Sequence, residues 1–255
     1  MEEKFKKLRI FNAFIGFLHL AQGGLMLWLS NNFSLPLQTS FVKFNPISQQ
    51  LEPYRETIFE LPLGPIVAGF LFLSAIAHFS VSVMPTINAW YNKNLTKGMN
   101  IARWIEYSFL SSLMIVVIAM LTGMYDAISL VLMFALNAMM ILFGLVMEVY
   151  SQTTEKTNWL SYIFGCIAGV FPWIAIALYL VFAGEGDMKA PDFVYWIFFS
   201  IFLFFNVFAV NMVLQYKKVG KWKDYLYGEK AYIVLSLVAK SLLAWQVWAG
   251  TLRSV

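Results

Sequence analysis

The stretch "YIVLSLVAKSLLAWQVWAG", from Tyr232 to Gly250, decides how this chain folds. It is apolar almost throughout and has the length of about 20 residues that a helix needs to cross a bilayer. Lys240 nevertheless lies near its middle, at a depth of roughly 18 Å if each residue rises 1.5 Å from the inner end. From that depth a lysine cannot easily extend its ammonium group to water. Since a charge inside the bilayer is costly, we expect Lys240 to have a buried partner and a role.

The composition places the whole chain in a membrane. Of its 255 residues, 60% are apolar and only 13% are charged, whereas a soluble domain carries roughly 25% charged residues. The single cysteine, Cys166, excludes a disulfide framework within the chain and a cysteine-based zinc site. The net charge of +4 is modest and is explained by membrane topology, so we expect no nucleic-acid partner.

Hydropathy predicts seven membrane-spanning helices in a single domain over residues 1–255. The expected spans are about 8–30, 62–84, 100–122, 126–148, 159–182, 192–216 and 228–252. Because six spans follow the first, the basic start and apolar run at the N-terminus indicate a retained helix rather than a cleaved signal peptide. The expected fold class is therefore an all-α membrane protein, a seven-helix bundle.

Positive charges alternate between the two ends of these spans. On the side of the N-terminus they are Lys4, Lys6, Lys7, Arg9, Lys93, Lys97, Arg103, Lys156, Lys217, Lys218, Lys221 and Lys223. On the opposite side they are Lys43, Arg55, Lys189 and Arg253. Cytoplasmic loops carry an excess of Lys and Arg, so we expect an integral, multi-pass protein with its N-terminus cytoplasmic and its C-terminus extracellular.

The outer connection over residues 31–61 is much longer than the other loops. Within it, "LQTSFVKF" (Leu37 to Phe44) alternates in polarity like a short strand. We expect a short β-hairpin that covers the outer face, and an unstructured loop is the alternative. Loops of this length are often functional, and contact with a second copy of the chain is one candidate role.

The buried lysine indicates a chemistry. Burial disfavours the ammonium form of Lys240, and its amine can then attack an aldehyde to form a Schiff base. A protonated Schiff base in hydrocarbon needs a counterion, and we assign this role to Glu106, the carboxylate that lies clearly inside a span. The alternative for Glu106 is a structural ion pair with Arg103, three residues earlier on the same helix face. Glu148 ends the fourth span, where a solvated helix end is its simplest interpretation.

Two segments resemble a known family. The run "RWIEY" (Arg103 to Tyr107) is similar to the arginine-aromatic-x-carboxylate-aromatic pattern of microbial rhodopsins. The run "LSLVAKSLLAWQVWAGTL" (Leu235 to Leu252), the inverted orientation and the long first outer loop resemble the heliorhodopsin family over the whole chain. The resemblance implies a rhodopsin-like bundle that binds all-trans retinal covalently at Lys240, has no enzymatic activity and forms a homodimer.

The resemblance also implies a cavity on the inner side of the lysine. His78 and His19 would line it with Glu106, and His78 would receive or relay the Schiff-base proton. Further candidates for the cavity or for proton acceptance are Ser236, Arg103 and Glu148. A retinal pocket needs apolar and aromatic walls, and residues at suitable depth or spacing are Tyr107, Ser111, Met114, Asn137, Met140, Gly169, Trp173, Phe205 and Asn206.

Departures from the proton-pump pattern shape the functional prediction. Outward pumps of the microbial type carry a carboxylate four residues before the lysine. They also carry a hydroxyl four residues after the first counterion, and a proton-donating carboxylate eleven residues after it. Here those positions are Ser236, Leu110 and Val117. We therefore predict a photoreceptor or light-dependent regulator without outward pumping, with membrane lipid and an unidentified cytoplasmic signalling protein as partners.

The sequence leaves two alternatives open. One is light-gated or light-driven proton transport, for which Glu148 near the inner mouth is the relevant carboxylate. The other is a retinal-free receptor or transporter in which Lys240 and Glu106 form only an ion pair.

Overall fold

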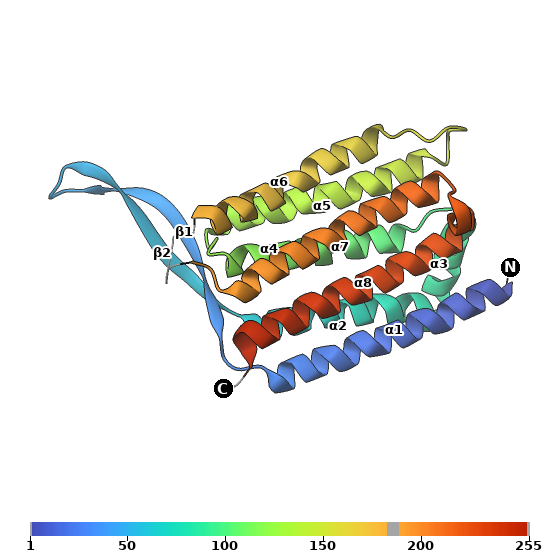
Figure 1. The fold of residues 1–255 in the computed structure, drawn as a ribbon, viewed down its shortest axis with the longest axis horizontal. Helices are drawn as coiled ribbons and strands as arrows, with labels where there is room; N and C mark the ends of the chain where they lie inside the picture. The colour runs from blue at the N-terminus through green and yellow to red at the C-terminus, as the bar shows by residue number, and fades with distance from the viewer. Residues whose placement is uncertain (1, 183–188, 254–255) are drawn as a thin grey trace.

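A computed structural model describes residues 2–182 and 189–253 of the chain. Within these ranges, seven helices are long and apolar enough to cross a membrane, which confirms the predicted bundle. They are α1 Glu2–Leu29, α2 Leu63–Val83, α4 Ile101–Leu121, α5 Ala127–Tyr150, α6 Leu160–Phe182, α7 Asp192–Tyr216 and α8 Tyr225–Val247. A π-helical turn, η3 Trp248–Leu252, extends the last helix. The helices run up and down beside one another, so the N-terminus and the C-terminal end lie at opposite ends of the bundle (Figure 1).

One helix was not expected from the sequence. α3, Pro85–Thr96, follows α2 directly and lies at the end of the bundle where the N-terminus also lies (Figure 1). Pro85 begins it, a position where the missing N–H of proline is not needed by the helix. Its Tyr91 and Leu95 pack into a small core with α1 and α8, while most of its other side chains are polar. A helix this short and polar leaves no signal in a search for membrane spans.

The predicted β-hairpin is present and longer than expected. β1 Ser34–Asn45 pairs antiparallel with β2 Gln50–Pro62, and a bulge shifts the register between Leu37 and Gln38. Its base is held to the bundle by the backbone N–H of Gln38, which donates to the carbonyl of Tyr125 at 2.8 Å. The rest projects away from the helices (Figure 1), so the expectation that it covers the outer face is wrong.

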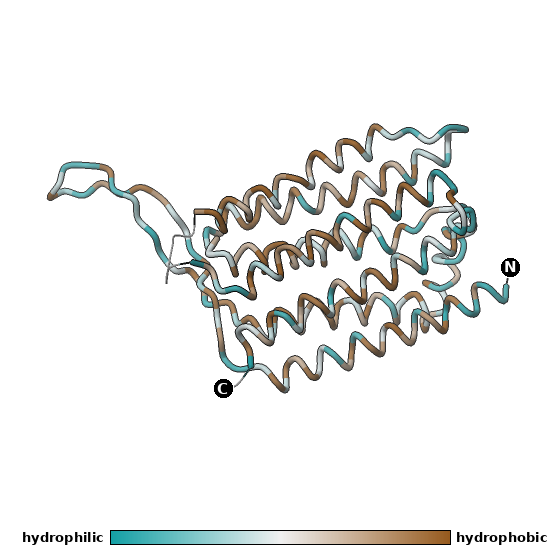
Figure 2. Tube along the Cα trace, in the orientation of Figure 1, coloured by the Kyte–Doolittle hydropathy of each residue, from teal (hydrophilic) through white to brown (hydrophobic). Residues whose placement is uncertain are grey.

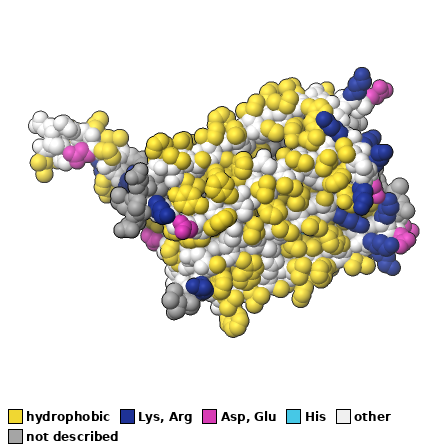
Figure 3. Space-filling view, in the orientation of Figure 1, with side chains coloured by type: hydrophobic (Ala, Val, Ile, Leu, Met, Phe, Trp, Pro, Cys, Tyr) yellow, Lys and Arg dark blue, Asp and Glu magenta, His cyan; other side chains and the backbone are white. Residues whose placement is uncertain are grey.

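The outer surface of the bundle is suited to lipid. Large apolar side chains are exposed along the helices, among them Phe17, Trp196 and Phe199, each between 59% and 70% exposed. The hydropathic colouring of Figure 2 is brown over the helix bodies and teal at the loops. Figure 3 shows Lys and Arg side chains gathered at the end of the bundle that carries the N-terminus. The protein is therefore an integral, multi-pass membrane protein.

Candidate functional site

Lys240 and its partners form the centre of the site. The ammonium Nζ of Lys240, on α8, donates to Oε1 of Glu106 on α4 at 2.6 Å and to Oγ of Ser74 on α2 at 2.5 Å. The Ser74 hydroxyl in turn donates to the same Glu106 oxygen at 3.1 Å. The side chain of Lys240 is 4% exposed and that of Glu106 is 12% exposed. A buried charge of each sign thus neutralises the other, and a serine bridges the two.

The structure brings Lys240 and Glu106 together as the sequence predicted, but Ser74 was missed. A serine in a membrane helix usually bonds the carbonyl one turn earlier, so its presence in the second span indicated nothing about Lys240. Glu106 contacts Lys240 and not Arg103, which excludes the alternative of a structural pair between Glu106 and Arg103.

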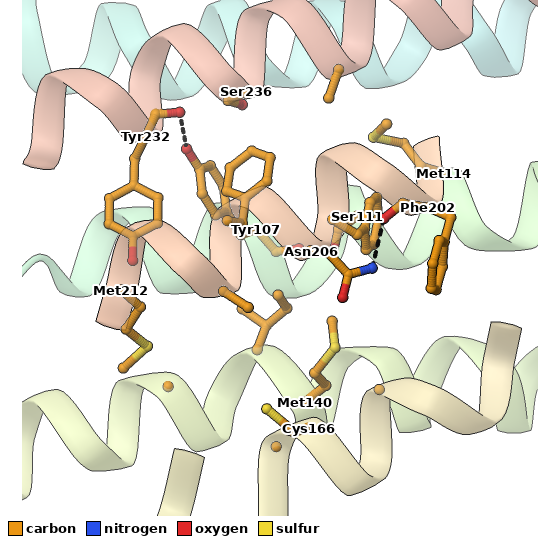
Figure 4. A pocket seen from close by; sticks show the side chains of 18 of the residues that line it. Tyr107, Ser111, Met114, Met140, Cys166, Phe202, Asn206, Met212, Tyr232 and Ser236 are labelled. Atoms are coloured by element: carbon orange, nitrogen blue, oxygen red, sulfur yellow. Dashed lines mark hydrogen bonds between the residues drawn. The ribbon is translucent and has the colours of Figure 1, made fainter. Parts of the chain in front are cut away.

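A cavity of about 260 Å³ adjoins Lys240 between α4, α5, α6, α7 and α8. The predicted residues that line it are Tyr107, Ser111, Met114, Met140, Gly169, Trp173, Phe205, Asn206 and Ser236, most of which are labelled in Figure 4. Its volume is close to the lower limit of ordinary small-molecule sites, which is about 300 Å³. Trp104, Phe202, Phe208 and Tyr232 also line it and were not predicted, because sequence spacing alone did not indicate which aromatic side chains turn inward.

Close packing of helices shapes this cavity. A Cβ atom on Gly169 of α6 would collide with Sδ of Met140 on α5, so a larger residue there would displace that methionine from its present place in the wall. In the same way, a Cβ on Gly144 would collide with the indole ring of Trp104. Trp173 meets the ring of Phe205 edge to face, with ring centroids 5.4 Å apart. The walls are therefore apolar, aromatic and specific in shape.

The prediction that Asn137 lines the pocket is wrong. Asn137 is fully buried, but it lies behind the lining rather than in it. Its amide donates to the hydroxyl oxygens of Ser111 and Ser112, at 2.8 and 3.1 Å. Ser111 does line the cavity, so Asn137 orients a wall residue and does not face the cavity itself.

The two histidines lie together, in agreement with the neighbourhood that the family resemblance implies for them. The rings of His19 on α1 and His78 on α2 are stacked, with centroids 5.7 Å apart. Nδ1 of His78 is 2.8 Å from Oδ1 of Asn12. Both nitrogens of His19, Nε2 of His78 and Oγ of Ser236 have no hydrogen-bond partner within residues 2–182 and 189–253, although all are buried. These unpaired polar atoms could hold or pass a proton near Lys240.

A second charged cluster lies toward the N-terminal end of the bundle. We call Arg103, Glu148 and Glu229 the inner cluster, and their side chains are 4%, 0% and 1% exposed. The guanidinium of Arg103 bridges the two carboxylates, contacting Glu148 at 2.8 Å and also Glu229. The interpretation of Glu148 as a solvated helix end is therefore wrong, because α5 continues to Tyr150 and α4 and α8 cover the carboxylate. Neither Arg103 nor Glu148 lines the cavity at Lys240.

Glu229 was missed by the sequence analysis, although a signal for it was present. It lies eleven residues before Lys240, which is about three helical turns, so the two side chains share one face of α8. Its place as the fifth residue of the helix, beside the exposed Lys230, made it resemble an ordinary polar end.

Aromatic side chains connect the inner cluster to the cavity. The Arg103 guanidinium carbon lies 4.5 Å from the ring centroid of Trp104 and 4.0 Å from that of Tyr232, and both rings line the cavity. The Trp104 indole N–H donates to Glu148 at 2.5 Å. The Tyr107 hydroxyl donates to the backbone carbonyl of Tyr232 at 2.9 Å (Figure 4). Side chains in this wall of the cavity are therefore in direct contact with the inner cluster.

Comparisons with known proteins agree with this architecture. The family model described as Heliorhodopsin matches residues 8–252 of the chain. The crystal structure of a light-driven proton pump from Leptosphaeria maculans has a TM-score of 0.63 and 14% sequence identity, covering 97% of this chain and 95% of that one. At this identity the likeness shows the fold alone. A search among curated proteins finds no significant match.

Proposed function

Since this chain belongs to the heliorhodopsin family of retinal-binding, light-responsive membrane proteins, we propose that it is a photoreceptor or light-dependent regulator that holds all-trans retinal covalently on Lys240. The observation that carries the proposal is the buried amine of Lys240 at the wall of an aromatic cavity, paired with Glu106. An apolar aldehyde fits this combination, because the amine can form a Schiff base and the rings can enclose the hydrocarbon.

Retinal, when bound, supplies light absorption and isomerisation. The chain contributes a negative charge beside the Schiff base and the apolar walls of the cavity. Glu106 provides a negative charge for a protonated Schiff base, and Ser74 orients that carboxylate by donating to it. His78 and His19 offer ring nitrogens that have no hydrogen-bond partner among the described residues, so we assign to His78 the acceptance or relay of a proton.

Absence of outward pumping is part of the proposal. The positions that carry a relay in outward pumps hold Leu110 and Val117, which are each 2% exposed and apolar, and Ser236. Neither Leu110 nor Val117 can take up or release a proton, so a proton would have no route in that direction. A light-induced current in voltage-clamped cells expressing the protein would contradict this part and favour transport instead.

The orientation and the partners belong to the same proposal. We place the N-terminus in the cytoplasm, because most Lys and Arg residues lie at that end (Figure 3). A homodimer is supported by the exposed apolar residues Phe41, Val42 and Phe44 on the projecting hairpin. A signalling protein would meet the basic inner end. Light-scattering mass measurement of the wild type and of a hairpin-shortened variant would test the dimer, and only the wild type should have the mass of two chains.

An absorption spectrum tests the central proposal. The full chain would be expressed with all-trans retinal beside Lys240→Ala and a matched control, Lys230→Ala, which removes an exposed lysine from the same helix. We expect a visible band in the wild type and the control, lost in Lys240→Ala and bleached by hydroxylamine in light. No visible band in any of the three proteins would refute retinal binding at Lys240.

A further inference from the structure

Four exposed lysines lie in the short connection between α7 and α8. They are Lys217, Lys218, Lys221 and Lys223. We call residues 217–223 the basic turn, and it lies at the end of the bundle where Lys and Arg side chains gather (Figure 3). None of the four pairs with a carboxylate among the described residues. The acid that follows them, Asp224, is already paired with Lys4 at 2.8 Å. The basic turn therefore carries uncompensated positive charge.

The length of α7 places the basic turn among lipid headgroups. This helix has 25 residues, so it is about 37 Å long at 1.5 Å per residue. A bilayer is about 30 Å thick across its hydrocarbon core and about 40–45 Å thick with its headgroups. A helix of this length that crosses the core ends within the headgroup layer rather than beyond it. The lysines that follow α7 directly are therefore at the depth of lipid phosphates.

Trp222 holds the basic turn against the side of the bundle. Its indole N–H donates to Oδ1 of Asn211 at 2.7 Å, although Asn211 lies more than one helical turn before the end of α7. The Trp222 ring also meets the ring of Tyr227 edge to face, with centroids 5.0 Å apart. Trp and Tyr are enriched where a membrane meets water. The turn thus folds back toward the membrane instead of projecting into water.

The basic turn has a lysine at a position where glycine is favoured. Lys218 has a φ of 53°, in the left-handed region. Its N–H donates to the carbonyl of Gln215 at 3.2 Å, and the N–H of Val219 donates to that of Leu214 at 3.0 Å. These two bonds form a Schellman motif, in which glycine usually takes the left-handed position because it has no Cβ. The helix end therefore does not require a lysine at 218, and a separate role explains its presence better.

We propose that the basic turn binds the phosphate headgroup of an anionic phospholipid, on the membrane face at the N-terminal end of the bundle. Ammonium groups donate charge-assisted hydrogen bonds to phosphate oxygens, and clusters of lysines beside a membrane helix attract anionic lipid. The helix dipole favours cations only near the last turn of α7, so it does not account for Lys221 and Lys223. A soluble acidic protein would have to displace headgroups to reach lysines at this depth. The site does not depend on retinal.

Lipid binding to the full chain tests this inference. The protein in neutral detergent, without retinal, would be titrated with phosphatidylglycerol, which is anionic, and separately with phosphatidylcholine, which has no net charge. Native mass spectrometry would follow the lipid molecules retained on the protein. We expect phosphatidylglycerol to bind more tightly, with a preference that becomes smaller as the salt concentration rises.

Two variants with four substitutions each assign the binding. Replacing all four lysines of the basic turn by Gln should lower the affinity for phosphatidylglycerol by roughly ten-fold or more, since each lysine near an anionic surface contributes about a five-fold preference. The matched control removes the same charge from exposed, unpaired lysines at the same end of the bundle. It replaces Lys6, Lys93, Lys97 and Lys156 by Gln. The control should keep most of the affinity.

Single variants separate lipid binding from folding. Lys218→Gly removes one charge and places glycine where the backbone favours it. Its melting temperature should equal or exceed that of the wild type, while its affinity for phosphatidylglycerol should fall about five-fold. Trp222→Phe keeps all four lysines but loses the bond to Asn211. It should also bind phosphatidylglycerol more weakly, because the lysines are no longer held in one place.

Three results would overturn the proposal. Equal affinity for the two lipids would show that the charge of the headgroup is not recognised. An equal loss of affinity in the two four-fold variants would show attraction by the whole basic end rather than a site in the basic turn. Unchanged phosphatidylglycerol binding in the variant of the basic turn, together with loss of an acidic soluble protein from it, would assign the lysines to a protein partner.

Discussion

Replacing Arg103 by glutamine tests the inner cluster as a structural element. The substitution leaves two carboxylates, 0% and 1% exposed, without the guanidinium that bridges them. Removing one partner of a buried ion pair typically costs about 3–5 kcal/mol of unfolding free energy. For a chain of this length 1 kcal/mol corresponds to roughly 2–4 °C, so we expect Arg103→Gln to lower the melting temperature by about 10 °C. The melting temperature of Arg103→Lys should lie between those of the wild type and Arg103→Gln, because an ammonium keeps the positive charge but cannot bridge both carboxylates in the same way.

The matched control is a water-exposed ion pair at the same end of the bundle. Lys4 contacts Asp224 at 2.8 Å, with side chains 63% and 45% exposed. Exposed pairs contribute about 0–1 kcal/mol, so Lys4→Gln should lower the melting temperature by less than about 4 °C. The Lys4 hydrogen bond holds the pKa of Asp224 below its usual range. This small contribution is therefore present at neutral pH and is lost as the pH falls through the folded pKa of Asp224.

Thermal unfolding in detergent, followed by circular dichroism, would measure both variants with and without retinal. The comparison without retinal removes the stabilisation that a bound ligand adds. If Arg103→Gln is no less stable than Lys4→Gln, the inner cluster is not a buried ion cluster in the protein in solution, and the reasoning fails.

Three further predictions concern the cavity. Glu106→Gln should move the visible absorption band to the red or abolish it by deprotonating the Schiff base, because the nearby negative charge is lost; an unchanged spectrum would contradict the counterion role. Ser74→Ala should produce a smaller spectral shift in the same measurement, since it removes two hydrogen bonds, each worth about 1 kcal/mol, and no charge. Gly169→Leu should abolish pigment formation, because the new side chain would displace Met140 from the cavity wall; Gly24→Leu, with open space at its Cβ, is the control and should keep the pigment.

The sequence predicted the long helices well because their signal is local. A run of about 20 apolar residues is visible without knowledge of neighbouring segments, and the family resemblance is confirmed by the match over residues 8–252. α3 escaped because it is short and polar, and the reach of the hairpin escaped because alternation indicates a strand but not the direction in which it projects.

Side-chain partners depend on contacts between helices, and there prediction was less complete. Lys240 and Glu106 could be paired because few charges lie deep in the spans. Glu229 and Ser74 could not be recognised, since one resembles a helix end and the other an ordinary backbone-bonded serine. Arg103 was assigned to the wrong neighbourhood for the same reason: spacing along α4 places it near Glu106, but its long side chain extends to partners on α5 and α8.

The contact between Gly144 and Trp104 has a consequence for the evolution of this protein. A Cβ at position 144 would overlap the indole, so the two positions cannot vary independently. A larger residue at 144 is tolerated only with a smaller ring at 104, and that exchange would also remove the indole N–H from Glu148. Lineages that enlarge residue 144 therefore also remove one hydrogen-bond donor from the inner cluster.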